Sequence, residues 1–88
     1  MKKKTRKVVL ADKSENKQTE YLKKVGERLK YYRKKAGYTS YEYFAYEHEF
    51  SRPQYGKYEA GANIQLNTLI KILEAFGVSL EEFFKGFN

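Results

Sequence analysis

The sequence has no cysteine, one proline, one histidine and no long apolar run. Without cysteine there can be neither a disulfide framework nor a thiolate metal site. The charged residues 1–7 are followed by only four apolar residues, too few for a secretory signal, and no later run could span a membrane. We therefore expect a cytoplasmic protein with no membrane association.

The common signatures of catalysis are also missing. His48-Glu49 lacks the second histidine of a metalloprotease helix, and there is no glycine-rich phosphate-binding loop. The histidine falls at an inward-facing helical position, so no serine has a free base beside it. We expect no enzymatic activity, no cofactor and no metal.

Aromatic residues are plentiful, with nine tyrosines and six phenylalanines among 88 residues. A chain of this length forms one small domain that buries roughly 60–65% of its unfolded surface. The aromatic side chains must therefore supply much of the core.

Positive charge is concentrated at the N-terminus. Residues 1–18 carry seven Lys or Arg against two acidic residues, whereas the other seventy residues have a net charge of only +2. Residues 1–18 show no sustained periodicity, so we expect a disordered basic arm there and a folded domain over residues 19–88. The arm could be a solvated tail, a short strand that pairs with another chain, or a segment laid along DNA.

The first helix is predicted from about Thr19 to Ala36, ending at Gly37. Its apolar positions recur at spacings of three and four: Leu22, Val25, Leu29, Tyr32 and Ala36. The outer face carries cations that are expected to be solvated: Lys23, Lys24, Arg28, Lys30, Lys34 and Lys35. Arg33 instead lies near the edge of the apolar face, where a guanidinium needs a partner.

Two short helices are predicted next, separated by a tight turn. The second begins near Thr39 or Ser40, where Thr39 with Glu42 forms a capping box and Tyr38 packs on Tyr43.

The third helix covers about Arg52 to Glu59. Its start is marked by Ser51 with Gln54, by the pair Phe50 and Tyr55, and by Pro53 in the first turn. One side carries Tyr55, Tyr58 and Glu59. The other is almost free of apolar surface and should be exposed, with Gln54 at its boundary: Arg52, Pro53, Gly56 and Lys57.

The last two helices are predicted after the loop Ala62 to Leu66. Asn67 is a fair N-cap for an apolar helix that ends at Gly77, and Ser79 with Glu82 caps a short final helix. Phe83, Phe84 and Phe87 exceed what a terminal turn normally buries, so they are either core residues or a homodimer contact.

The chain resembles the Cro/C1-type, or XRE-like, helix-turn-helix family over roughly Leu22 to Phe84. The resemblance is carried, in order, by Arg33-x-x-x-Gly37, Ala45, Ser51-Arg52, Tyr58-Glu59-x-Gly61, and Leu69 to Val78 followed by Ser79-Leu80-Glu81-Glu82.

The resemblance implies an all-α, lambda-repressor-like bundle of five short helices that binds DNA through its third helix. It also implies an ion pair between Arg33 and Glu59. The expected base-contacting residues are Arg52, Pro53, Gln54, Gly56 and Lys57, and the expected phosphate-contacting residues are Thr39, Ser40, Tyr41, Asn63 and Gln65.

The sequence departs from the family pattern before the third helix. One residue is extra between Gly37 and Ala45, and Glu49 stands where the family usually has Gly. A left-handed conformation there would cost a non-glycine residue about 1–2 kcal/mol. Tyr55 and His48 make the core bulkier and more polar than usual.

We expect sequence-specific binding of double-stranded DNA and repressor-like regulation of transcription. The alternative is a helix-turn-helix fold used as a protein-interaction module or antitoxin-like partner, which the tyrosines of the second helix, Tyr43 and Tyr46, favour.

Overall fold

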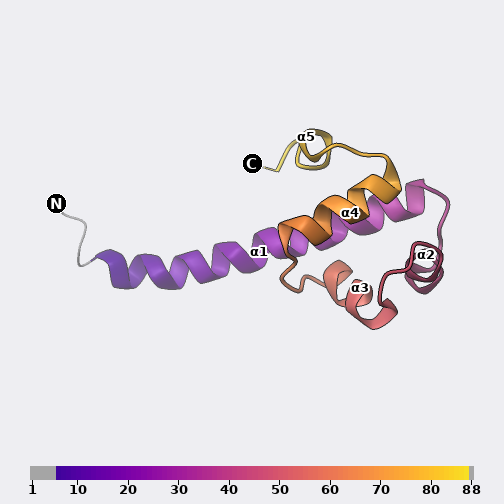
Figure 1. Ribbon diagram of the computed structural model, residues 1–88. Coiled ribbons are helices and arrows are strands. Elements are labelled where there is room, and N and C mark those ends of the chain that lie inside the picture. The colour runs from indigo at the N-terminus through magenta and orange to yellow at the C-terminus, as the bar shows by residue number, and fades with distance from the viewer. Residues whose placement is uncertain (1–5, 88) are drawn as a thin grey trace.

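The computed structural model describes the backbone of residues 6–87 and the side chains of residues 17–87. That part of the chain is all-helical (Figure 1). Its five helices are α1 (Arg6–Lys35), α2 (Tyr41–Glu47), α3 (Arg52–Glu59), α4 (Leu66–Phe76) and α5 (Leu80–Phe83). The predicted class, number and order of helices are confirmed.

The first helix begins well before the expected position. It starts at Arg6 rather than near Thr19, so residues 6–18 are helical where disorder was expected. These residues include Lys, Glu and Gln, which are good helix formers, and extending an existing helix avoids the cost of nucleation. Residues 1–5 lie outside the described part. The division of the chain into an arm and a domain stays a prediction.

Aromatic side chains supply part of the core, beside aliphatic ones. Phe44 lies at its centre, fully buried, with ring centroids 4.7 Å from His48, 4.9 Å from Phe76 and 5.1 Å from Tyr55. Each of the five helices adds buried residues to one cluster: Val25, Leu29, Phe44, Ala45, Tyr55, Leu69, Ile72, Leu73 and Phe83. The core therefore joins α2 and α3 to the rest of the bundle.

Two predicted helix caps are wrong by one or two residues. Ser40, not Thr39, caps α2, and its Oγ accepts a hydrogen bond from the Tyr43 amide at 3.2 Å. The extra residue thus lies in the loop before α2. Likewise α4 starts at Leu66, ahead of the predicted cap Asn67, whose Oδ1 accepts from the Thr68 amide. Burial of Leu69 and Ile72 sets the phase of α4, which overrides the weaker capping preference.

The predicted caps of α3 and α5 are confirmed. Ser51 Oγ accepts from the Gln54 amide at 3.3 Å, and Ser79 Oγ accepts from the Glu82 amide at 3.0 Å. Pro53 occupies the first turn of α3. The start of α3 therefore lies where the local sequence predicted it.

Arg28 is not the solvated cation that the helical pattern predicted. Its Nη1 donates to the carbonyls of Phe83 at 2.6 Å and Lys85 at 3.1 Å, and its guanidinium lies over the Phe87 ring. These carbonyls are left without helical partners where α5 ends. Arg28 thus ties the end of the chain to α1.

The helices form an elongated molecule of 52 × 25 × 20 Å. In Figure 1, α1 runs along its length, α3 and α4 lie against its C-terminal half, and α2 lies near its C-terminal end. Over the described residues, no helix has both the length and the apolar character that crossing a membrane requires.

Candidate nucleic-acid interface

The exposed face of α3 is the candidate site. Arg52, Pro53, Gln54 and Lys57 are all exposed, whereas Tyr55 on the opposite side is only 1% accessible. One buried anchor and a capped start therefore hold a short helix with its polar side chains in solvent. Such a helix can enter the major groove and bring guanidinium, amide and ammonium groups to base edges and phosphates.

Gly56 does not belong to this open face. A Cβ at Gly56 would lie 2.6 Å from Cε1 and 2.8 Å from Cζ of Tyr41, so the Tyr41 ring covers this point of α3. Tyr41 also lies 6.4 Å from the Tyr55 ring. Both residues were expected to contact DNA, but here they form the close crossing of α2 and α3. Their contacts with DNA stay predictions. The role that the structure shows for them is packing between α2 and α3.

The expected phosphate-contacting residues are divided between two places. Thr39 is exposed and Ser40 partly exposed at the start of α2. The Ser40 hydroxyl donates to Glu42 Oε1 at 3.1 Å, which brings a carboxylate close to this helix start. Asn63 and Gln65 are exposed in the segment that follows α3. Asn63 and Gln65 are therefore better placed to contact a phosphate than Ser40, which lies beside the Glu42 carboxylate.

Arg33 and Glu59 form a two-pronged ion pair. Arg33 Nε lies 2.8 Å from Glu59 Oε2, and Nη2 lies 3.1 Å from Oε1. The third nitrogen, Nη1, donates to the Tyr38 carbonyl at 2.8 Å. The side chains are only 4% and 8% exposed, and the hydrogen bond with Glu59 is the main cause that raises the pKa of Arg33. The pair joins α1, the loop before α2 and the end of α3.

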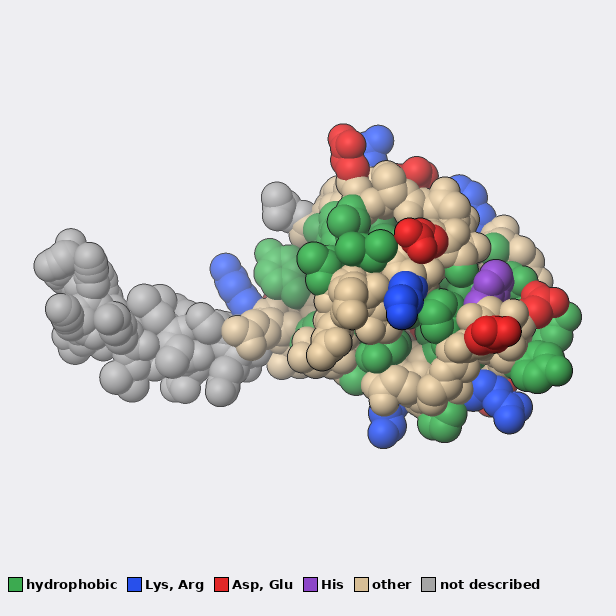
Figure 2. Space-filling view, viewed as in Figure 1, with side chains coloured by type: hydrophobic (Ala, Val, Ile, Leu, Met, Phe, Trp, Pro, Cys, Tyr) green, Lys and Arg blue, Asp and Glu red, His purple; other side chains and the backbone are tan. Residues whose placement is uncertain are grey.

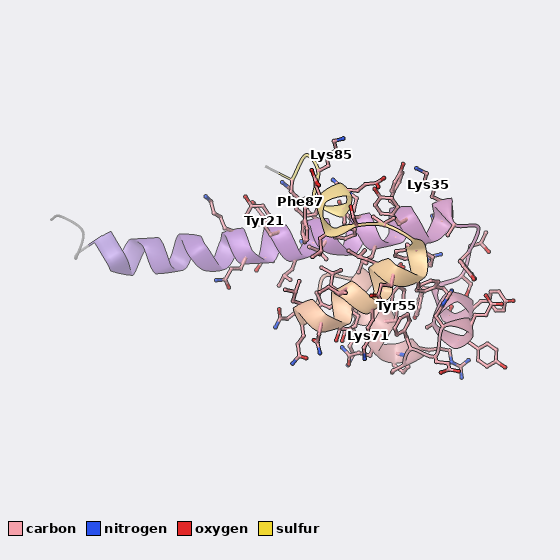
Figure 3. All side chains as sticks on the ribbon, turned by 45° about the horizontal axis from the view of Figure 1, so that its top comes forward. Tyr21, Lys35, Tyr55, Lys71, Lys85 and Phe87 are labelled. Atoms are coloured by element: carbon pink, nitrogen blue, oxygen red, sulfur yellow. The ribbon has the colours of Figure 1, made fainter. Side chains whose placement is uncertain are left out.

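The Tyr55 hydroxyl lies buried, with no hydrogen-bond partner among the described residues (Figure 3). Burial is the main cause that raises the pKa of Tyr55, and the negative charge of Glu59 adds to it. Tyr55 is therefore neutral at physiological pH, and it contributes ring area to the core rather than charge.

The turn between α2 and α3 contains the one strained residue that the sequence singled out. Glu49 has φ 62°, in the left-handed region, and the Phe50 amide donates to the Ala45 carbonyl at 2.8 Å across the turn. A glycine normally fills such a position because it has no Cβ. The turn has the expected geometry although its residue is unusual.

His48 has the surroundings that its inward position predicted. Its ring lies 4.7 Å from Phe44 and 5.8 Å from Tyr38, and its Nε2 is 3.3 Å from the Tyr38 hydroxyl. Among the described residues no group of three or more His, Cys, Asp or Glu could hold a metal ion. His48 is thus a partly buried residue at the edge of the core, with a polar partner.

Gly26 helps to position α3, and the sequence reasoning missed it. A Cβ there would lie 2.5 Å from the Glu59 carbonyl oxygen and 2.7 Å from that of Tyr58. The backbones of α1 and the end of α3 therefore meet at this point. A glycine inside a strongly helical pattern was the available signal, because such a glycine usually has a packing reason.

These features define a helix-turn-helix protein: a capped helix with an exposed polar face, preceded by a tight turn and a shorter helix. A family model described as helix-turn-helix matches residues 29–83, more than half of the chain. The chain belongs to the Cro/C1-type helix-turn-helix family, whose members bind DNA as regulators of transcription. The searches of curated proteins and of solved structures found no match.

Proposed function

We propose that this protein binds double-stranded DNA in a sequence-specific way and represses transcription by occupying its site. The observation that carries the proposal is the exposed face of α3, where Arg52, Gln54 and Lys57 extend from a helix anchored by Tyr55. Arg52 is the expected guanine contact, since a guanidinium can bond O6 and N7 together. Gln54 is suited to adenine or phosphate, and Pro53 to a thymine methyl group.

The test is binding to a duplex selected from a random pool, compared with unselected duplex of the same length. Arg52→Ala should weaken binding to the selected duplex by about 1–3 kcal/mol and binding to the unselected one much less. Fluorescence anisotropy at several salt concentrations measures both affinities.

Lys85→Ala is the matched control, because it also removes one exposed positive charge. Lys85 lies beyond α5, on the side of α1 away from α3 (Figure 3). It should weaken binding to both duplexes equally and slightly. Equal losses on both duplexes for Arg52→Ala would show that Arg52 contacts phosphate rather than a base.

A protein-interaction or antitoxin-like role is the second candidate. It is favoured by Tyr43 and Tyr46, which are 54% and 67% exposed on α2. A protein with this role alone would select no preferred duplex from the random pool, so the same experiment separates the two functions.

A homodimer through the C-terminal helix is also proposed, on a smaller surface than the sequence indicated. Phe83 is fully buried within the protomer, and Phe87 packs against the core under Arg28. Phe84, 37% exposed, is left as the apolar contact for a partner. Sedimentation of Phe84→Ser with and without the selected duplex tests this contact.

A further inference from the structure

One face of α2 combines exposed tyrosines with carboxylates. It consists of Glu42, Tyr43, Tyr46, Glu47 and Glu49, all exposed, and is called here the acidic tyrosine face. At 3.6 residues per turn the four residues within the helix span an arc of about 140°. Figure 2 shows acidic and hydrophobic side chains close to the single histidine, at the end of the molecule where α2 lies. The four helical residues of the face therefore lie on one side of α2, and Glu49 lies in the turn directly after the helix.

This face has a charge opposite to that of the molecule as a whole. The sequence has no Lys or Arg from residue 36 to residue 51, although the chain has a net charge of +7. Glu47 is held in place because it accepts hydrogen bonds from the hydroxyls of Tyr38 and Tyr43, and these bonds lower the pKa of Glu47. A fixed, ionised carboxylate repels phosphate, so the face is suited to a cationic partner rather than to DNA.

The strongest cationic segment of the same chain is at its other end. Residues 1–18 hold seven Lys or Arg against two acidic residues. Residues 6–18 form the start of α1, and the rest of that helix, residues 19–35 with a length of about 25 Å, lies between them and α2. Figure 1 shows the start of α1 and the whole of α2 at opposite ends of the molecule. The helical part of the basic segment, residues 6–18, therefore lies away from the acidic tyrosine face of its own chain.

We propose that the acidic tyrosine face of one molecule binds the basic residues 1–18 of a second copy, which gives a head-to-tail association. Tyr43 and Tyr46 offer ring faces to lysine ammonium groups, and the carboxylates pair with them. The two surfaces are different, so the contact is heterologous and can repeat from one molecule to the next. Exposed ion pairs contribute only about 0.2–1 kcal/mol each, so the association needs several of them and is sensitive to salt.

The test is sedimentation velocity of the full-length protein without DNA, over a range of protein concentrations. At about 0.1 M salt the sedimentation coefficient should rise with concentration, and at about 1 M salt the rise should disappear because charges are then screened within 3 Å. Glu49→Lys should weaken the association about tenfold, as expected for loss of one ion pair and gain of one repulsion. Circular dichroism establishes that each variant is folded, and Tyr46→Ala, at a residue 67% exposed, is a second variant that should also weaken association.

Glu74→Lys is the matched control, because it makes the same change in net charge at an exposed position on α4. It should leave the association unchanged. Mixing two variants is the decisive arm. The triple variant Lys2→Glu, Lys3→Glu, Lys4→Glu and the variant Glu49→Lys should each associate more weakly than the unsubstituted protein. A mixture of the two should associate more strongly than either variant alone, because the basic residues of the second variant can bind the unaltered face of the first.

Three results would overturn the proposal: a monomer at every concentration, an equal effect of Glu74→Lys and Glu49→Lys, or no stronger association in the mixture than in either variant alone. Loss of the association in Phe84→Ser would assign it to the C-terminal helix instead. None of these measurements uses DNA, so their failure leaves the proposed DNA-binding function to its own test.

Discussion

Glu59 has two structural partners that make its removal costly. Its carboxylate accepts two hydrogen bonds from Arg33, which is 3% exposed, and its backbone carbonyl lies against Gly26 of α1. Removing one partner of a shielded ion pair leaves the other charge buried without compensation. At the scale of single residues, we therefore expect removal of either charge of this pair to lower the stability of the fold.

Glu59→Ala should lower the free energy of unfolding by about 3–5 kcal/mol, because Arg33 would be left buried and unpaired. Urea denaturation followed by circular dichroism measures the change. Glu74→Ala, which truncates an exposed glutamate, should change it by less than about 0.5 kcal/mol. An unaltered midpoint for Glu59→Ala would mean that water solvates the pair.

Substitution of Glu49 is expected to stabilise the protein, in contrast to substitution of Glu59. Glu49→Gly should stabilise the protein by about 0.5–1 kcal/mol, because relief of the left-handed strain exceeds the extra entropy of glycine in the unfolded chain. Glu49→Ala keeps the Cβ and should give no such gain. The pair of denaturation curves decides whether the backbone conformation, rather than the side chain, sets the energy of this turn.

At the scale of elements, α3 is held at both ends by different means. Its start depends on the Ser51 cap and Pro53, and its end is fixed against α1 at Gly26. Local capping alone cannot set the angle between α1 and α3. The angle depends on the close contact of the two backbones at Gly26. Glycine permits this contact because it has no side chain to separate the two helices.

Gly26→Ala tests this contact, because the contact determines whether the substitution raises or lowers the free energy of unfolding. On a free helix the substitution would stabilise by about 0.5–1 kcal/mol, since glycine disfavours helix interiors. Here the added methyl group would overlap the carbonyls of Tyr58 and Glu59, so we expect destabilisation of about 1–3 kcal/mol. Lys30→Ala, at an exposed position of α1, should be nearly neutral. A more stable Gly26→Ala protein would contradict the close crossing.

The sequence predicted most of the elements but only part of the site. Caps and apolar spacing located α3, and Ser51, Pro53 and Tyr55 lie where those local rules put them. Family resemblance supplied the Arg33–Glu59 pairing, which joins residues from separate helices. The solvated role expected for Arg28 was wrong, and the packing of Gly56 against Tyr41 was not foreseen, because each contact is made with a residue distant in the sequence, Phe83 for Arg28 and Tyr41 for Gly56. Helical periodicity contains no information about such crossings.

At the scale of the whole molecule, charge is unevenly distributed along the sequence. The N-terminal residues are strongly basic, α3 presents Arg52 and Lys57, and α2 is acidic. A basic segment beyond the domain can contact phosphates without reading bases. The proposed DNA binding would then have a specific part on α3 and a non-specific part on residues 1–18.

Replacing Lys2, Lys3 and Lys4 with Gln should weaken binding to selected and unselected duplexes alike. The slope of log affinity against log salt should fall by about 0.9 for each phosphate that the lysines neutralise in the unsubstituted protein. Anisotropy titrations at four or more salt concentrations measure that slope. An unchanged slope would show that these lysines are not bound to DNA, and a weakening confined to the selected duplex would assign them a role in base recognition.

The Arg33 guanidinium joins three parts of the chain: α1, the Tyr38 carbonyl and the end of α3. The position of α3 is therefore determined as the domain folds, and DNA need not order it. Binding then loses little conformational entropy at the recognition helix, so affinity should be governed by the fraction of molecules that are folded. Substitutions that destabilise the fold away from the DNA-binding face would then lower the concentration of folded, binding-competent protein. They would not change which DNA sequences the folded protein prefers.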